Sequence, residues 1–214
     1  MVQQNRKMDE TVAITVKKMQ PVVYSFTYAN KFLSTEWMRR LYFTHIYPHF
    51  LHAFSVWGTD NPRATYIQPL IKLQKKVVRI LFRAHPRTST KPLMHKLQIL
   101  NITNLYIYRV CLETHPYIYT TDNITRPDHD HNYLFASEIH DYPTRYSLRG
   151  HHYVPNPYKY SKTCEPKLTM PPFQRKYSDI RNSLPEWLRA ISDFKTFKKA
   201  LKTYLLEKQS KPDT

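Results

Sequence analysis

The sequence predicts a mainly α fold, in which a helical unit is followed by a long irregular arm and a C-terminal helix. Apolar residues recur at helical spacing in the first half and near the C-terminus, and this periodicity fails between residues 115 and 172. The chain has 214 residues, of which 41% are hydrophobic, and this suffices for a modest core. We expect four segments: an N-terminal segment (1–30), the helical unit (31–114), the arm (115–190), and the C-terminal helix and tail (191–214).

The first predicted helix begins near Ser34, whose hydroxyl can cap a helix. Glu36 lies in the first turn, where the helix dipole favours a carboxylate. Pro48 is expected to kink or split this helix because proline has no backbone N–H, and Gly58 can end it. We expect its apolar bulk to come from Trp37, Leu41, Phe50 and Phe54.

The clearest amphipathic helix lies between Ala64 and Phe82. Its apolar residues are Ile67, Leu70, Ile71, Val77, Val78 and Leu81. Five cations fall largely on another face, namely Lys72, Lys75, Lys76, Arg79 and Arg83. Such a stripe is typical of a surface that contacts nucleic-acid phosphates, and equally of a solvated helix face. The five cations are therefore candidate binding residues, and both interpretations stay open.

Two further helical patterns follow. Thr90 precedes a short helix with Pro92 in its first turn, a position that proline tolerates. Asn101 or Thr103 is expected to cap another helix that extends to about Glu113. Beyond that point Pro, Tyr, His, Asp and Asn dominate, which predicts the irregular arm.

The last predicted helix begins after Ser192 or Asp193, either of which can cap it. Pro185 interrupts the chain before it. Its apolar residues at helical spacing are Phe194, Phe197, Leu201, Tyr204 and Leu205. Cations occupy its other faces, and the candidate binding residues among them are Lys198, Lys199 and Lys202.

The charge of the chain is strongly basic. Lysine and arginine number 33 against 16 acidic residues, so the formal net charge is +17. Residues 31–110 and 146–214 carry the excess, and the acidic, histidine-rich residues 111–145 lie between them. This asymmetry favours RNA or DNA, bound through its backbone, because neutralised phosphates release counterions. A generally basic surface is the alternative.

Composition argues against several classes of site. Gly58 and Gly150 are the only glycines, which excludes glycine-rich phosphate loops, and we expect no small-molecule substrate. Cys111 and Cys164 are too few and too far apart for a disulfide framework or a zinc finger. Cys111 precedes His115 by four residues, but we interpret this pair as packing rather than as a nucleophile with its base.

The N-terminal residues do not form a signal peptide, because charged residues interrupt any apolar core. We therefore expect a protein that is not secreted and is located in the nucleus or the cytoplasm. The largely uncharged residues 41–62 contain Pro48 and three histidines, which indicates a buried or partly buried helix rather than a bilayer span. No membrane partner is expected.

The cluster from Asp128 to His152 is the one with metal-ligating chemistry, because imidazoles and carboxylates suit divalent ions. On an extended loop His129 and His131 would lie on the side opposite Asp128 and Asp130, so few ligands would converge. The spacing is not diagnostic of a zinc or two-metal site. We predict no metal site, and a metal hydrolase using this cluster is the enzyme-class alternative.

Aromatic residues alternate with cations in the arm. The segments Arg145-Tyr-Ser-Leu-Arg149 and Tyr158-Lys-Tyr160-Ser-Lys162 combine cations for phosphates with rings that can stack on bases. Arg145 and Arg149 are therefore candidate nucleic-acid-binding residues. Segments of this kind also occur where an arm packs onto a protein body, and the sequence leaves both interpretations open.

An ordered series of motifs extends from about Leu33 to Leu206. It consists of Leu41-Tyr-Phe-Thr-His-Ile-Tyr-Pro-His49, Val56-Trp57-Gly58, Leu73-Gln-Lys-Lys-Val-Val-Arg-Ile80, Thr144-Arg145, Asn182-Ser-Leu-Pro185 and Phe197-Lys-Lys-Ala-Leu-Lys202. In order and spacing this series resembles the C-terminal part of LINE-type (jockey-like) non-LTR retrotransposon reverse transcriptases. The resemblance implies that residues 31–114 form a thumb-like unit, which in the family follows the polymerase palm and grips template and primer.

The chain departs from the family's pattern at informative places. Ile180-Arg181 stands where the family has Trp before Asn-x-Leu-Pro, and His52-Ala53 stands where Tyr-Gly is usual. The family's polymerases hold two magnesium ions with palm aspartates, and this chain has no Asp-Asp pair. Two-metal phosphoryl transfer needs clustered carboxylates, so we expect no enzyme activity and no cofactor.

The resemblance thus implies a C-terminal fragment of an RNA-directed DNA polymerase that lacks the catalytic palm and binds nucleic acid. The alternative is a host interaction protein, or a non-functional relic, in which the helices only pack together.

Overall fold

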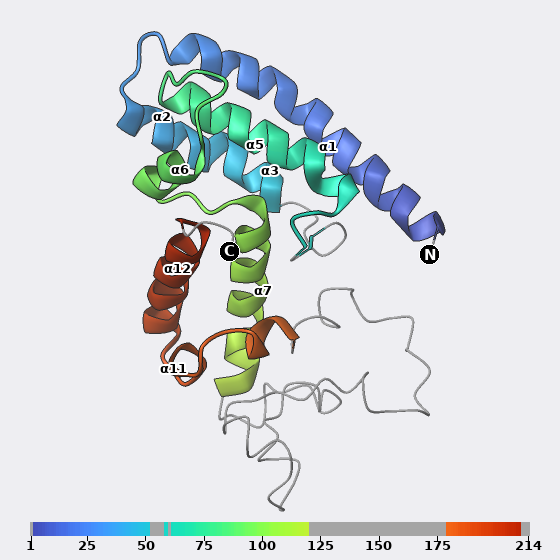
Figure 1. Cartoon of the computed structure of the whole chain (residues 1–214), viewed down its shortest axis with the longest axis vertical. Helices are drawn as coiled ribbons and strands as arrows, with labels where there is room; N and C mark the ends of the chain where they lie inside the picture. The colour runs from blue at the N-terminus through green and yellow to red at the C-terminus, as the bar shows by residue number, and fades with distance from the viewer. Residues whose placement is uncertain (1, 52–57, 60, 120–178, 211–214) are drawn as a thin grey trace, which may run out of the picture. The chain divides into compact units, whose positions relative to one another are not determined.

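The computed structural model describes residues 2–51, 58–59, 61–119 and 179–210, and these residues are mainly helical (Figure 1). No strand occurs among them. The predicted mainly α fold class is therefore confirmed. In chain order the elements are α1 (Val2–Ala29), α2 (Thr35–Leu41), the π-helical η1 (Tyr42–Ile46), α3 (Tyr47–Leu51), the 3₁₀-helical η2 (Thr65–Ile67), α5 (Gln68–Leu81), α6 (Lys91–Leu97), α7 (Ile102–Tyr119), α11 (Glu186–Arg189) and α12 (Phe194–Ser210).

The chain divides into two compact units. The first comprises Met1–Tyr106 together with Tyr204–Thr214, and the second comprises Ile107–Thr203. Both boundaries fall inside helices, because α7 and α12 each contribute residues to the two units. The end of the chain thus belongs to the first unit, a grouping that the sequence pattern does not indicate.

Helix α1 spans 28 residues of the N-terminal segment, where the sequence pattern did not indicate a helix. Its buried residues recur at steps of three and four, as a helix face requires. They are Val12, Thr15, Met19, Val23 and Phe26, followed by Asn30 just beyond the helix. The opposite face carries large apolar side chains too, among them Ile14 and Tyr24. The contrast between the two faces is therefore weak in the sequence, which explains the missed helix.

The helix predicted from Ser34 is split before Pro48, as expected. The π-helical turn η1 separates α2 from α3, and Pro48 is the second residue of α3. The interruption relieves the conflict at the proline, which can neither donate a helical hydrogen bond nor tolerate the carbonyl four residues earlier. The buried face is Met38, Tyr42, Ile46 and Phe50, at steps of four.

One expectation for this region is wrong, and another is confirmed in position only. Trp37 is 57% exposed and does not supply core bulk; its ring lies under the Arg40 guanidinium, 4.7 Å from the ring centroid. Ser34 occupies the N-cap position but makes no side-chain hydrogen bond there. Trp37 lies one position before Met38, where the buried face begins, and its hydrophobicity alone does not place it in the core.

Helix α5 lies at the centre of the first unit and packs against α1, α2 and α6, and α1 extends alongside it (Figure 1). Its amphipathic pattern is confirmed. The buried face, with η2, consists of Ile67, Leu70, Gln74, Val77, Val78 and Leu81. Ile71 is only partly buried, and Gln74 takes a place in the core that the apolar pattern did not predict.

The predicted caps of α7 and α12 are present. The Asn101 side-chain oxygen accepts a hydrogen bond from the Asn104 backbone N–H at 2.7 Å, and the Asp193 carboxylate accepts one from the Thr196 N–H at 2.8 Å. The hydrogen bonds from Thr196 also lower the pKa of Asp193. Helix α7 continues past Glu113 to Tyr119, and α11 forms within the range expected to be irregular.

Candidate nucleic-acid interface

Four of the five predicted cations share one face of α5, and the fifth, Arg83, follows the end of the helix. Positions 72, 75, 76 and 79 fall within one stripe at about 100° per residue, opposite the buried face, and Arg83 follows two residues after the helix ends at Leu81. Lys72, Lys75, Lys76 and Arg83 are exposed, and Arg79 is partly buried. We call these five residues the α5 basic face. The rigid helix holds the first four of them on one surface, which is the arrangement needed to contact several phosphates at once.

Two members of the α5 basic face also hold the fold together. Arg79 Nε donates a hydrogen bond to the Thr88 carbonyl at 3.0 Å. Arg83 donates from Nε and Nη2 to the Asn30 carbonyl, at 3.1 and 2.6 Å. Arg83 itself has a positive φ of 51° and follows the end of α5. Within the described residues the side chains of Lys72, Lys75 and Lys76 form no hydrogen bond or ion pair with the rest of the fold, so the freely presented charge of the face comes from them.

The surroundings of α5 add no opposing charge along the chain. No acidic residue occurs between Asp60 and Glu113, whereas ten lysines and arginines do. The nearest described carboxylates along the sequence, Glu36 and Glu113, each form an ion pair on their own helix, with Arg40 and Arg109. This acid-free stretch strengthens the positive potential of the face, and the sequence shows it directly.

A buried polar network sets the position of α5. Gln74 is 1% exposed; its Nε2 donates to the Tyr42 hydroxyl at 3.2 Å and to the Leu100 carbonyl at 2.9 Å, and its Oε1 accepts from the Ile102 N–H at 3.1 Å. Burial raises the pKa of Tyr42, so its hydroxyl stays neutral. The network anchors the buried side of α5 and thereby directs its basic side to solvent.

Gln209 of α12 also hydrogen-bonds backbone groups in the segment that connects α6 to α7. Its Nε2 donates to the Ile99 carbonyl at 3.0 Å, and its Oε1 accepts from the Asn101 N–H at 3.1 Å. Together the two glutamines satisfy backbone groups on every residue from 99 to 102, within the first unit. Sequence reasoning missed both glutamines, because a side chain that pairs with a distant backbone leaves no local pattern.

The other predicted binding residues lie elsewhere. Lys198 and Lys199 are exposed on α12, and Lys202 of the same helix is partly buried. These three belong to the second unit, whereas the α5 basic face belongs to the first. Arg145 and Arg149 lie outside the described residues, as does the cluster from Asp128 to His152. Within the described ranges no group of three or more histidine, cysteine or acidic side chains is placed to hold a metal ion.

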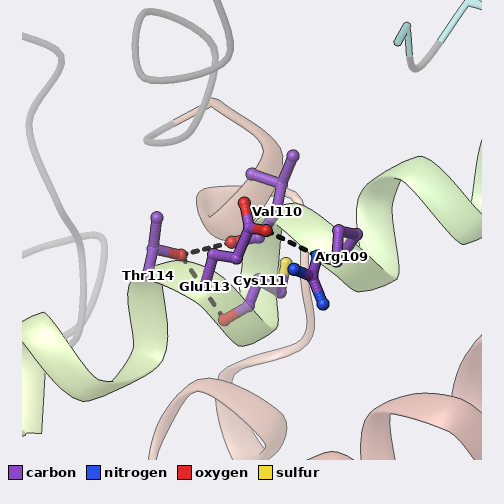
Figure 2. A network of polar contacts seen from close by, with 5 residues as sticks. All are labelled: Arg109, Val110, Cys111, Glu113 and Thr114. Carbon is purple, nitrogen blue, oxygen red and sulfur yellow. Dashed lines mark hydrogen bonds and ion pairs between the residues drawn. The ribbon is translucent and has the colours of Figure 1, made fainter. Parts of the chain in front are cut away.

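Cys111 does not have the environment of a nucleophile. Cys111 lies buried on α7. Figure 2 shows it beside the ion pair between Arg109 and Glu113, and beside Thr114, whose hydroxyl donates a hydrogen bond to the Val110 carbonyl at 2.6 Å. Burial raises the pKa of the thiol to about 12, against a smaller lowering by Arg181. A thiol held in its neutral form is a poor nucleophile.

His115 has a packing role in the second unit. Its ring stacks on Phe197 with 4.2 Å between centroids, and Nε2 lies 2.9 Å from the Ile191 carbonyl, to which it donates as the neutral tautomer with its proton on that nitrogen. Burial lowers the pKa of this imidazole. The prediction that Cys111 and His115 serve packing agrees with these contacts.

No protein-family model, curated protein or solved structure matches this chain. Among the described helices, none is long and apolar enough to cross a membrane.

Proposed function

We propose that this chain binds nucleic acid through the phosphate backbone, with the α5 basic face as its principal contact. The observation that carries the proposal is the presentation of Lys72, Lys75 and Lys76 on the exposed side of a helix whose other side is anchored in the core. Because such contacts involve phosphates, we expect affinity without sequence preference and with a steep dependence on salt.

The motif series in the sequence supports a more specific origin. We propose that the chain corresponds to the C-terminal, palm-lacking part of a LINE-type non-LTR retrotransposon reverse transcriptase. The absence of an Asp-Asp pair predicts no primer extension on RNA or DNA templates with magnesium or manganese. Extension by homogeneous protein, abolished by substitution of an aspartate of this chain, would contradict that expectation.

The test of binding compares two double charge reversals in the full chain. Lys75→Glu/Lys76→Glu removes two cations of the α5 basic face, and Lys96→Glu/Lys208→Glu changes the net charge equally at two other exposed lysines of the first unit. Arg79 and Arg83 are left intact because they hold backbone carbonyls.

Affinity for a fluorescent DNA duplex is then measured against salt concentration. Each lost phosphate contact flattens the slope of log affinity against log salt by about 0.9, so the α5 variant is expected to lose about 1.8. The control variant is expected to change it far less. Equal slopes in the two variants would show that the α5 basic face is only a solvated surface and would favour a protein-interaction role.

A further inference from the structure

A row of exposed aromatic rings lies at the C-terminal end of α1. Tyr24, Tyr28 and Phe32 are 79%, 62% and 72% exposed, and they follow one another at intervals of four residues. Tyr24 and Tyr28 lie on the side of α1 opposite its buried face, and Phe32 follows just beyond the helix. We call these three residues the α1 aromatic stripe. Exposed rings gathered in this way mark an interaction surface.

The spacing of the rings suits nucleic-acid bases that are not stacked on one another. Tyr28 and Phe32 lie 5.4 Å apart between centroids with their planes tilted by 58°, so they do not cover one another as parallel rings would. From Tyr24 to Tyr28 the helix rises about 6 Å, compared with about 3.4 Å between stacked bases along one strand of a duplex. The rings can therefore accept bases that are splayed apart, but not the stack of an intact duplex.

The charges around the α1 aromatic stripe favour a polyanion. Lys31 Nζ lies 5.8 Å from the Tyr28 ring centroid, and Lys17 and Lys18 are exposed earlier on the same helix. No acidic residue occurs between residues 11 and 35. An apolar partner helix would gain nothing from these cations, whereas a nucleic-acid strand offers both phosphates and base faces.

The α1 aromatic stripe also adjoins the α5 basic face. Arg83, the last cation of that face, donates two hydrogen bonds to the carbonyl of Asn30, the residue before Lys31. The Asn30 side chain in turn donates to the Ile80 carbonyl at 2.6 Å. These bonds tie the C-terminal ends of α1 and α5 together within the first unit, so rings and cations come from adjoining elements.

We propose that the α1 aromatic stripe is a stacking platform for single-stranded RNA, with bases on Tyr24, Tyr28 and Phe32 and phosphates on Lys31 and the α5 basic face. This inference rests on the proposed nucleic-acid binding and specifies its partner. The two phenol hydroxyls select RNA over DNA, because a hydroxyl can both donate to and accept from the ribose 2′-hydroxyl.

The experiment titrates the full chain with three fluorescent probes: an unstructured RNA of about 12 nucleotides, the DNA strand of the same sequence, and a DNA duplex. Tyr24→Ala/Tyr28→Ala removes two rings. Gln20→Ala/Ser25→Ala is the matched control at exposed positions of α1. We expect the first variant to lose at least about tenfold in RNA affinity while its duplex affinity changes less than about twofold, and the control to behave as wild type.

A conservative variant separates stacking from the hydroxyl contacts. Tyr24→Phe/Tyr28→Phe keeps the rings, so RNA binding is expected to persist while the preference for RNA over the DNA strand falls. It also keeps the test valid if the alanine variant unfolds. In that case the wild-type chain is titrated with the RNA carrying 2-aminopurine, whose fluorescence is expected to change on stacking. An unchanged signal together with an unchanged preference overturns the proposal.

The remaining outcomes are distinguishable. Duplex binding by wild type with unchanged RNA affinity in a folded alanine variant overturns the stacking platform and leaves the proposed function standing. No binding of any probe by wild type overturns both. Loss of a concentration-dependent dimer in the alanine variant, with RNA affinity unchanged, would make the stripe a self-association surface and overturn the proposal as well.

Discussion

The two compact units bury different kinds of polar group. Within the described part of the first unit the buried polar side chains are all amides and hydroxyls: Thr15, Asn30, Thr59, Gln74, Thr90, Thr103, Asn104 and Gln209. Those of the second unit are Thr114, His115, Arg181 and Arg189, and Cys111 is buried near them on α7. Only the set from the second unit includes side chains that carry a charge or can acquire one near neutral pH.

This difference determines how each unit responds to its solution conditions. An amide neither titrates nor reacts near neutral pH, so the polar core of the first unit is insensitive to pH. In the second unit burial holds both the Cys111 thiol and the His115 imidazole in their neutral forms, raising the pKa of one and lowering that of the other. The α5 basic face therefore stands on the less sensitive of the two units.

The largest expected effect concerns the reactivity of Cys111. In a Cys164→Ser background, alkylation of the folded chain by iodoacetamide at pH 8 is expected to be roughly a thousandfold slower than alkylation in guanidinium. The reason is the rise of the thiol pKa from 9.0 to about 12, which lowers the thiolate population by that factor. The measurement is the mass-spectrometric rate of label uptake. Rates within tenfold of each other would show that the second unit does not shield the thiol.

The next effect concerns Gln74 in the first unit. Gln74→Met preserves the side-chain length but leaves the Leu100 carbonyl and the Ile102 N–H without their partner. We expect the free energy of unfolding to fall by about 2–4 kcal/mol, measured by urea denaturation at pH 7. Gln20→Met, at an exposed position of α1, is the control and should stay within about 0.5 kcal/mol of wild type.

Gln74→Glu would give the first unit the pH sensitivity that distinguishes the second. Burial raises the pKa of a carboxyl, so the folded variant would bind more protons than the unfolded chain. Its stability should therefore decrease as pH rises above the ordinary carboxyl range, a dependence absent from Gln74→Met. If the free energies of unfolding of Gln74→Glu and Gln74→Met changed with pH in parallel, burial at position 74 would not disfavour a charged carboxylate.

The smallest effect concerns the pH response of the second unit through His115. Between its lowered native pKa and the ordinary value of 6.5, the folded chain binds fewer protons at this histidine than the unfolded chain. Its stabilising effect is thus complete above pH 6.5 and is lost as pH falls. The hydrogen bond to the Ile191 carbonyl and the charge of Asp193 raise the pKa of His115 and so oppose this lowering. The charge of Arg181 lowers the pKa further.

His115→Gln should flatten this response, because glutamine can still donate to the Ile191 carbonyl but cannot be protonated. The measurement is NMR titration of the histidine Cε1–H signals combined with amide hydrogen exchange over residues 186–206, from pH 7 downwards. An imidazole that titrates at or above 6.5 in the wild type would contradict the prediction.

The sequence predicted several local features correctly. The amphipathic α5 and the interruption before Pro48 depend on periodicity and on one missing N–H. The caps at Asn101 and Asp193 depend on side chains within three residues of their partners. The failed predictions both concern which face of a helix is buried. Helix α1 was missed because both of its faces carry apolar residues, and Trp37 was placed in the core because hydrophobicity alone does not determine which face is buried.

By itself, then, the sequence determined the mainly α class, the basic charge and the spacing that aligns four cations on one face of α5, with Arg83 just beyond its end. Only the tertiary structure decided what those cations do: Arg79 and Arg83 bind carbonyls, whereas Lys72, Lys75 and Lys76 remain exposed. It also decided that Gln74 and Gln209 bind the residues before α7, across as many as 110 positions of sequence. The physical reason is range, because periodicity and capping act within a few residues, whereas a buried hydrogen bond requires a partner that only the packed chain brings within reach.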